Sequence, residues 1–218
     1  MRIHRTGTVF VFPLSTEEWM CGRVMLDVYH QCVRPNLIAG DSPLRSFPRA
    51  LLVEVYQPVF PTADMTTDVI SAKRLIPGIF ISEGCLEKDV WKVIGHHDVA
   101  PDEVEFPEAL ISKGSHIHLV RGEIELPIDL SFKDVRAINA YKTEYPCGIL
   151  GEIAIYQLGR ADEIDKPEVA VKLRDLARSD LRFSEHRDRI YDLLGEEKDE
   201  PYHQMAKRLG HDLSRFYG

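Results

Sequence analysis

The chain has 218 residues, of which 44% are hydrophobic and 28% are charged. This composition is typical of a globular protein with a substantial core, and it excludes a wholly disordered chain. No apolar run approaches the ~20 residues that cross a bilayer. The N-terminal apolar run is short, is broken by Pro13 and lacks a small-residue cleavage site, so we expect no secretory signal and a cytoplasmic protein.

The formal net charge of −8 is concentrated in one segment. Residues 83–108 hold eight acidic and two basic side chains, a net charge of −6. An acidic field repels nucleic acid and anionic membranes and attracts basic partners. The charge distribution therefore predicts a basic protein partner, with no nucleic-acid and no membrane partner.

The sequence pattern of the first 130 residues predicts strands. β-branched and aromatic residues over 8–14, 19–28 and 50–59 are typical of strands, and the first two are expected to form a hairpin. Gly22 predicts a bulge or a close packing contact. Shorter strands are expected at 78–82, 91–96, 116–120 and 123–128, the last two joined by a tight turn at Arg121-Gly122. Short strands at even spacing indicate a strongly bent antiparallel sheet or partial barrel.

Residues 131–218 predict helices. Segments 133–141 and 149–158 are helix candidates, and the Asp165-x-x-Glu168 capping box predicts a helix from Asp165. Gly195 is expected to stop a second helix. An apolar stripe over 202–216 predicts a third. The fold class is therefore α+β, with a β-rich domain at 1–130 and a helical region at 131–218 that packs on the same core or stands apart.

Histidines offer a candidate metal site. His116 and His118 alternate along a predicted strand, so both side chains point to one face. His96, His97 and Asp98 would supply further ligands if the two strands were neighbours. These residues lack the fixed spacing of a metal motif, so we expect strand histidines that hold no metal.

The four cysteines, Cys21, Cys32, Cys85 and Cys147, predict neither a zinc knuckle nor a redox motif. No two of them lie within the C-x₂₋₄-C spacing. Without an export signal we expect buried or free thiols rather than a disulfide framework. The chain also lacks a G-x-S-x-G elbow and the glycine-rich phosphate loops. We therefore expect no cofactor and no enzymatic activity.

The acidic segment presents a candidate protein-binding surface. Two aromatic residues in it are candidate anchors, and its carboxylates are expected to steer a basic partner. The residues that we assign to partner binding are Trp91, Asp98, Asp102, Glu103, Glu105, Phe106 and Glu108. The alternatives are a solvated loop without a partner and a carboxylate pair for glycoside chemistry, for which a proline-bounded loop makes a poor cleft.

Two stretches resemble the immunity protein 26 family of bacterial polymorphic toxin systems. The first, GTVFVFPLSTEEWMCGRVM, carries a G-x-V-F-x-x-P-L strand and then a strand with G-R-V; the matching residues are Gly7, Val9, Phe10, Pro13, Leu14, Gly22, Arg23 and Val24. The second, WKVIGHHDVAPDEVEFPEAL, resembles a W-x-V-I-G segment followed by an acidic loop; the matching residues are Trp91, Val93, Ile94, Gly95 and Pro107. Together the two blocks cover roughly residues 5–125.

The resemblance implies a cytoplasmic protein that binds and neutralises a cognate toxin domain without catalysis of its own. We therefore interpret the chain as an antitoxin-like immunity protein with an acidic, aromatic-containing contact surface. One alternative is a metal-dependent hydrolase that uses His96, His116 and His118. The other is a regulatory or scaffold module unrelated to a toxin.

Overall fold

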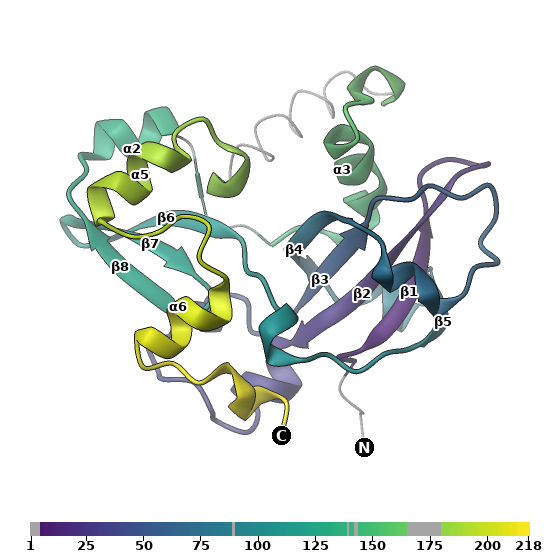
Figure 1. Ribbon diagram of the computed structural model, residues 1–218, viewed down its shortest axis with the longest axis horizontal. Coiled ribbons are helices and arrows are strands. Elements are labelled where there is room, and N and C mark those ends of the chain that lie inside the picture. Colours follow the sequence, from purple (N-terminus) through teal and green to yellow (C-terminus); the bar gives the residue numbers. More distant parts are fainter. Residues whose placement is uncertain (1–4, 89, 139, 142–143, 165–179) are drawn as a thin grey trace.

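The computed structural model describes residues 5–88, 90–138, 140–141, 144–164 and 180–218. Within these residues the chain forms two antiparallel sheets and several helices, which confirms the predicted α+β class. Figure 1 shows the two sheets next to each other, each with its own helices. The predicted strands are therefore divided between two sheets, and neither sheet closes into a barrel.

The first sheet has five strands in the order β4-β3-β2-β1-β5. Its strands are β1 (Thr8–Pro13), β2 (Trp19–Asp27), β3 (Ala50–Tyr56), β4 (Arg74–Ser82) and β5 (Lys92–His96). The predicted hairpin is confirmed, because β1 pairs with β2 from Val9 opposite Arg23 to Pro13 opposite Trp19. Every residue of β3 is buried, which is why its sequence is an almost continuous apolar run.

Gly22 on β2 occupies a close packing contact, as its place in an apolar strand predicts. A Cβ atom at this position would lie 2.6 Å from the ring of Phe10 and 2.9 Å from the Glu54 carbonyl oxygen. The register shift between β2 and β3 lies elsewhere, between Val24 and Leu26. Only a residue without a side chain therefore lets β1 and β3 approach β2 this closely.

The second sheet has three strands in the order β6-β7-β8. They are β6 (Glu108–Lys113), β7 (His116–Arg121) and β8 (Ile124–Ile128). The tight turn before β8 is confirmed, and Gly122 has a φ of 60° there, which glycine adopts without steric cost. β6 was not predicted, because it begins at a buried carboxylate, Glu108, inside the acidic segment.

The α-helices of the described residues are short. They are α1 (Gly84–Glu87), α2 (Phe132–Ile138), α3 (Leu150–Gln157), α5 (Arg187–Leu194) and α6 (Tyr202–Arg208). A π-helical turn covers Val28–Val33, and 3-10 turns cover Pro43–Ser46, Thr67–Ser71, Pro101–Glu103, Cys147–Ile149, Ala161–Glu163, Leu181–Phe183 and Leu213–Phe216. No helix in the described residues combines the length and the apolar character that a membrane crossing needs.

The structure confirms two of the predicted helices as α2 and α3, and α5 ends at Gly195, whose φ is 68°. The helix predicted from Asp165 lies outside the described residues. The third predicted helix is shorter than its apolar stripe, because α6 ends at Arg208 and Gly210 has a φ of 86°. A left-handed glycine ends a helix. The stripe continues on the next 3-10 turn, where Phe216 is buried.

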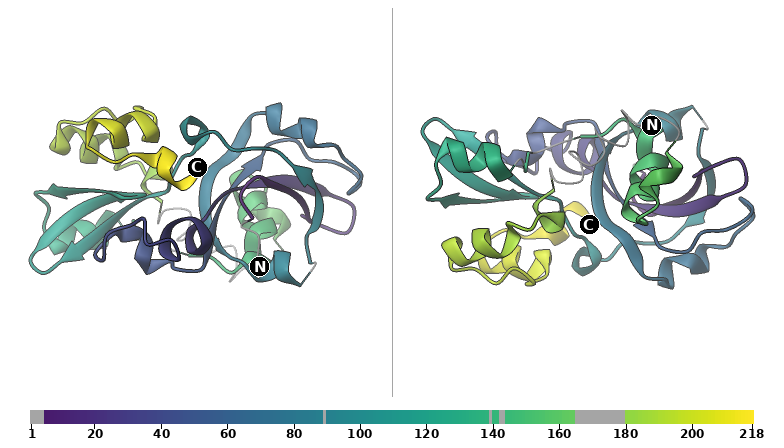
Figure 2. Two further views of the ribbon diagram at one scale, coloured as in Figure 1. Left: turned by 90° about the horizontal axis from the view of Figure 1, so that it is seen from below. Right: turned by 90° about the horizontal axis from the view of Figure 1, so that it is seen from above.

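The helices after residue 130 return to both sheets. α3 packs on the inner face of the first sheet, and α2, α5 and α6 pack against the second sheet (Figures 1 and 2). The core under α3 includes Phe10, Phe12, Leu51, Val53, Leu150, Ile153 and Ala154. A second core includes Met25, Leu52, Phe80, Phe106, Leu110, Leu119, Ile190 and Tyr202, and it therefore joins strands of both sheets.

Cys85 and Cys147 form a disulfide, which corrects the expectation of unpaired thiols at these positions. The Cα atoms are 5.8 Å apart although the residues are 62 positions apart in the chain. The fold brings α1, at the end of β4, next to the turn that precedes α3. This proximity comes from tertiary structure and leaves no local signal. Cys21 and Cys32 are buried free thiols, as expected.

The disulfide should stabilise the docking of α3 on the first sheet. We expect the double variant Cys85→Ser/Cys147→Ser to lose about 2–4 kcal/mol of unfolding free energy, because the unfolded chain regains the freedom that the cross-link removes. Denaturant unfolding with and without a reducing agent checks this. The wild type should lose stability on reduction and the double variant should not respond. A wild-type midpoint that reduction leaves unchanged would show that the bond does not form.

Candidate protein-binding surface

Residues 97–107, which we call the strap, contain most of the residues predicted to bind a partner. The strap leaves β5 of the first sheet and enters β6 of the second, so it crosses from one sheet to the other (Figure 1). Two buried arginines, Arg23 and Arg121, hold it, and these contacts decide which of its side chains remain exposed.

Arg23 on β2 holds the first half of the strap. Its side chain is 2% exposed and lies 2.9 Å from the Glu54 carboxylate. Arg23 Nη1 donates to the Asp98 carbonyl oxygen at 3.3 Å, and Nη2 donates to the Glu103 carboxylate at 3.2 Å. Arg74 joins the network, because it donates to the Glu103 carbonyl oxygen at 2.9 Å and lies 2.8 Å from Glu54. The buried guanidinium is thus paired and hydrogen-bonded, as a buried charge must be.

The titration of these groups follows from their contacts. Burial opposes the charge on Arg23, but Glu54, Tyr56 and Glu103 outweigh it and raise the pKa of Arg23. Burial and then Glu54 raise the pKa of Tyr56, so its neutral hydroxyl donates to Glu54. Partial burial alone would raise the pKa of Glu103, whereas the Ala100 N–H and Arg23 lower it. Glu103 is therefore held as a carboxylate that fastens the strap.

Arg121 on β7 holds the second half of the strap. Its side chain is 4% exposed and lies 2.5 Å from the Glu105 carboxylate. The other Glu105 oxygen accepts the N–H of Tyr202, the first residue of α6, at 3.1 Å. Phe106 is fully buried, and its ring centroid lies 4.5 Å from that of Tyr202. This half of the strap therefore lies between β7 and α6 and is bonded to both.

Glu108, at the start of β6, is fully buried and belongs to the same internal network. Arg187 on α5 donates to both of its carboxylate oxygens, each at 2.8 Å. Arg121 Nε lies 3.8 Å from the same carboxylate. A bidentate arginine–carboxylate pair fixes geometry as well as charge. Glu108 therefore joins α5 to the second sheet and does not face solvent.

Both predicted aromatic anchors are part of the core. Trp91 is 4% exposed and stacks on Phe10 with a centroid distance of 4.6 Å, and Phe106 has no exposed surface. The expectation that these rings lie on the surface is wrong, because each fills space between packed elements. Among the predicted binding residues, Asp98 and Asp102 are exposed, while Glu103 and Glu105 are partly exposed and paired with arginines.

The exposed part of the strap is a ridge, residues 98–102, whose residues contribute to the lining of two hollows. One hollow has a volume of about 550 Å³ and is lined in part by His96, Asp98 and Val99. The other has a volume of about 560 Å³ and is lined in part by Pro101 and His203. The Asp98 carboxylate is fully exposed, and its one contact in the described residues is the ring of His96, at 3.0 Å. The ridge thus offers two carboxylates beside concave surfaces.

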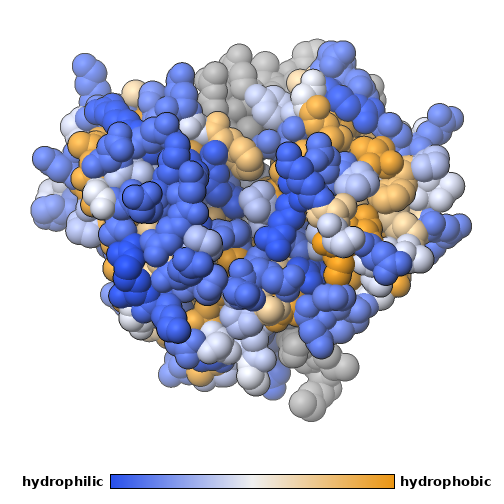
Figure 3. All heavy atoms as spheres, viewed as in Figure 1, coloured by the Kyte–Doolittle hydropathy of each residue, from blue (hydrophilic) through white to orange (hydrophobic). Residues whose placement is uncertain are grey.

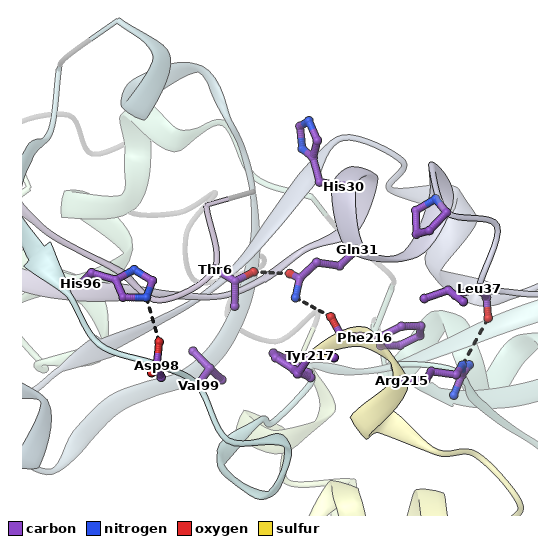
Figure 4. Close-up of a pocket in the computed structure, with 12 residues that line it drawn as sticks. Thr6, His30, Gln31, Leu37, His96, Asp98, Val99, Arg215, Phe216 and Tyr217 are labelled. Atoms are coloured by element: carbon purple, nitrogen blue, oxygen red, sulfur yellow. Dashed lines mark hydrogen bonds and ion pairs between the residues drawn. The ribbon is translucent and has the colours of Figure 1, made fainter. Parts of the chain in front are cut away.

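Figure 4 shows the hollow beside Asp98, bounded by the strap, the π-helical turn and the C-terminal residues. Gln31 accepts a hydrogen bond from Thr6 and donates one to the Phe216 carbonyl oxygen at 2.8 Å. Arg215 donates to the Leu37 carbonyl oxygen at 3.3 Å. These polar groups already have partners within the chain. The hollow therefore supplies shape beside the exposed carboxylate.

The histidines do not converge on a metal site. His96 lies on β5 of the first sheet, whereas His116 and His118 lie on β7 of the second. His118 contacts Glu125 at 3.0 Å, and His97 lies 3.2 Å from Arg23 Nη1. Among the described residues, histidine, cysteine, aspartate and glutamate side chains form no group of three or more that could hold a metal ion. The hydrolase alternative therefore lacks the histidine cluster on which it depends.

The cysteines do not present a reactive thiolate. Cys85 and Cys147 are bonded to each other. Burial, and then the charge of Glu54, raise the pKa of Cys21 to about 12, and burial raises the pKa of Cys32 further. A nucleophilic cysteine needs a lowered pKa and access to substrate. The four thiol positions therefore contribute to packing and cross-linking.

Sequence reasoning missed the arginines that hold the strap. The signal is a charged residue inside an otherwise apolar strand, as with Arg23 in MCGRVM and Glu54 in LLVEVY. A charge in such a position is expected to meet an opposite charge on a neighbouring strand, and these two residues do so in the β2–β3 register. Arg121 at the end of β7 shows the same signal less clearly.

A comparison with protein-family models matches residues 5–115 to the model described as Immunity protein 26. The match covers about half of the chain and includes the whole first sheet, Arg23 and the strap. Arg121 and Arg187 lie beyond it. Comparisons with curated proteins and with solved structures gave no match.

The strap passes so close to β4 that a single methyl group should displace it. A Cβ atom at Gly78 would lie 2.1 Å from the Glu105 carbonyl oxygen. We expect Gly78→Ala to lower the unfolding free energy by about 1–3 kcal/mol, the usual effect of overpacking. Gly148→Ala is the control, because a Cβ atom there meets no atom within 4 Å. Denaturant midpoints that are equal for both variants would contradict this placement of the strap.

Glu103→Gln tests the contact between the strap and Arg23. The pKa of Glu103 is lowered in the folded state from its ordinary value of 4.5. Its stabilising effect is therefore full above that pH and is lost as the pH falls through the folded-state pKa. We expect the variant to be about 1 kcal/mol less stable at neutral pH, since the side chain is partly exposed, and to approach the wild type in acid. Thermal unfolding across pH measures this difference, and a difference that does not change with pH would contradict the assignment.

Proposed function

Because the chain belongs to the immunity protein 26 family, we propose that it is an immunity protein that binds and neutralises a cognate bacterial toxin. Family membership is the observation that carries this proposal. In this proposal the protein acts by binding alone and without a cofactor.

The exposed ridge of the strap is the contact surface that we propose. Asp98 and Asp102 are solvent-exposed carboxylates, and they attract a basic toxin during diffusional encounter. The ridge is held in place by contacts with arginines that Glu103, Glu105 and Glu108 make, so these carboxylates act indirectly. Recognition and stability are therefore assigned to different carboxylates of one segment.

The gene neighbourhood separates this proposal from a scaffold role that involves no toxin. An immunity protein is expected beside a gene for a large secreted protein with a variable C-terminal domain. That C-terminal domain is the binding partner to test. A chain encoded far from any such gene would favour the scaffold interpretation.

We expect Asp98→Asn/Asp102→Asn to slow association with the neighbouring toxin domain several-fold at low salt and to flatten its salt dependence. Exposed charges act mainly through steering, which ions screen. Stability should change by less than about 0.5 kcal/mol, as is usual for surface substitutions. The measurement is stopped-flow or surface-based kinetics at two salt concentrations.

Asp162→Asn/Asp192→Asn is the matched control for the ridge variant. It removes the same charge from exposed positions on other elements, the 3-10 turn Ala161–Glu163 and α5. Its association rate should stay close to that of the wild type. If both double variants associate alike, the ridge is only a solvated face and the toxin contacts another surface.

A further inference from the structure

The two faces of the first sheet are covered in different ways. The inner face lies under α3. The outer face has a small buried core of Val9, Val11, Cys21 and Tyr56, and it lies under the connection between β3 and β4, residues 57–73. That connection carries a single 3-10 turn, Thr67–Ser71. A loop covers a sheet less completely than a helix does, so apolar side chains on this face remain partly exposed.

These partly exposed side chains form what we call the outer-face patch. Its members are Trp19, Phe60, Ala63, Met65, Val69, Ile70 and Ile94. All but Phe60 pack against the small core beneath. Figure 3 shows hydrophobic atoms gathered mainly over the half of the molecule that holds the first sheet, while the other half is mostly hydrophilic. Apolar surface collected in this way marks an interaction site more often than scattered single residues do.

Two aromatic residues give the patch fixed positions. Trp19 and Phe60 exchange backbone hydrogen bonds of 2.8 and 2.9 Å, so the start of β2 and the start of the connection are tied together. Phe60 is half-buried and is not among the residues that pack against the hydrophobic cores of the described residues. Tryptophan, phenylalanine and methionine are enriched in the centres of protein interfaces. Trp19, Phe60 and Met65 are therefore the candidate anchors on this face, in place of the buried Trp91 and Phe106.

The charges around the patch indicate a basic partner. Glu17, Asp64 and Asp68 are exposed around it. Lys92 lies 2.8 Å from Asp64, so this pair adds no net charge, and Lys73 offsets one of the two remaining carboxylates, which leaves one negative charge in excess. β5 links the patch to the ridge, because Ile94 lies in the patch and Asp98 follows the end of the same strand. The patch and the ridge thus form one continuous surface with a net acidic rim.

We propose that the toxin docks across the outer-face patch, with apolar residues on Trp19, Phe60 and Met65 and basic residues toward the acidic rim and Asp98. This inference rests on the proposed function and specifies where its binding energy lies. The ridge then governs the association rate, and the patch governs the dissociation rate.

The test compares Phe60→Ala and Met65→Ser with Phe132→Ala as the matched control. Phe132 is 50% exposed and lies on α2, over the second sheet. The probe is the C-terminal toxin domain encoded beside this chain. We expect Phe60→Ala and Met65→Ser each to raise Kd at least ~10-fold, chiefly through faster dissociation. Phe132→Ala should bind as the wild type does, and thermal unfolding should show all three variants folded.

Each outcome decides between the two proposals. If the wild type binds the toxin domain and the patch variants bind equally well, the proposal that the toxin docks on the outer-face patch is wrong, and the proposed immunity role stands. If the wild type does not bind, both proposals fail. Amide hydrogen exchange gives an answer that does not depend on variants: binding should slow exchange in residues 57–73 and leave α5 unchanged. Unaltered exchange over 57–73 in the complex would also overturn the patch.

Discussion

The burial of the Arg23 guanidinium is the constraint on which the rest of the structure depends. An ionised arginine at 2% exposure is tolerated only with acceptors around it, and Glu54 alone supplies too few. The strap supplies the other acceptors of the Arg23 guanidinium, which are the Asp98 carbonyl oxygen and the Glu103 carboxylate. This contact fixes how the chain leaves the first sheet, and Arg121 fixes how it enters the second. Arg23 reaches the exposed ridge only at the Asp98 carbonyl oxygen, and neither arginine contacts the Asp98 or Asp102 carboxylate.

The sequence predicts the elements whose signals are local. The β1–β2 hairpin, the turn at Gly122, α3 and the end of α5 at Gly195 follow from periodicity and turn chemistry within a few residues. The roles of the acidic residues do not, because a charge count over 83–108 ignores cations that the fold brings from elsewhere. Arg23 comes from β2 and Arg187 from α5, so Glu103 and Glu108 are paired although their own segment looks unbalanced.

The aromatic residues also show that the sequence alone does not predict which side chains the fold buries. Trp91 and Phe106 lie in an acidic segment, and composition alone gives them the character of anchors. Only the packing on Phe10 and Tyr202 shows that both rings are core residues. Trp19 and Phe60 look ordinary in the sequence, one in a strand and one among prolines. Their partial exposure depends on residues 57–73 lying over the outer face, a tertiary arrangement that no local pattern encodes.

The chain forms the first sheet and then the second. It returns to the first sheet as α3, and it ends with α5 and α6 packed against the second sheet. Its family match stops at residue 115, so Leu150, Ile153 and Ala154 on the inner face come from beyond it. Residues 5–115 cannot be transferred alone into another protein, because without α3 the apolar inner face of the first sheet would be exposed to solvent. A transfer of the first sheet of this chain to another protein has to include α3.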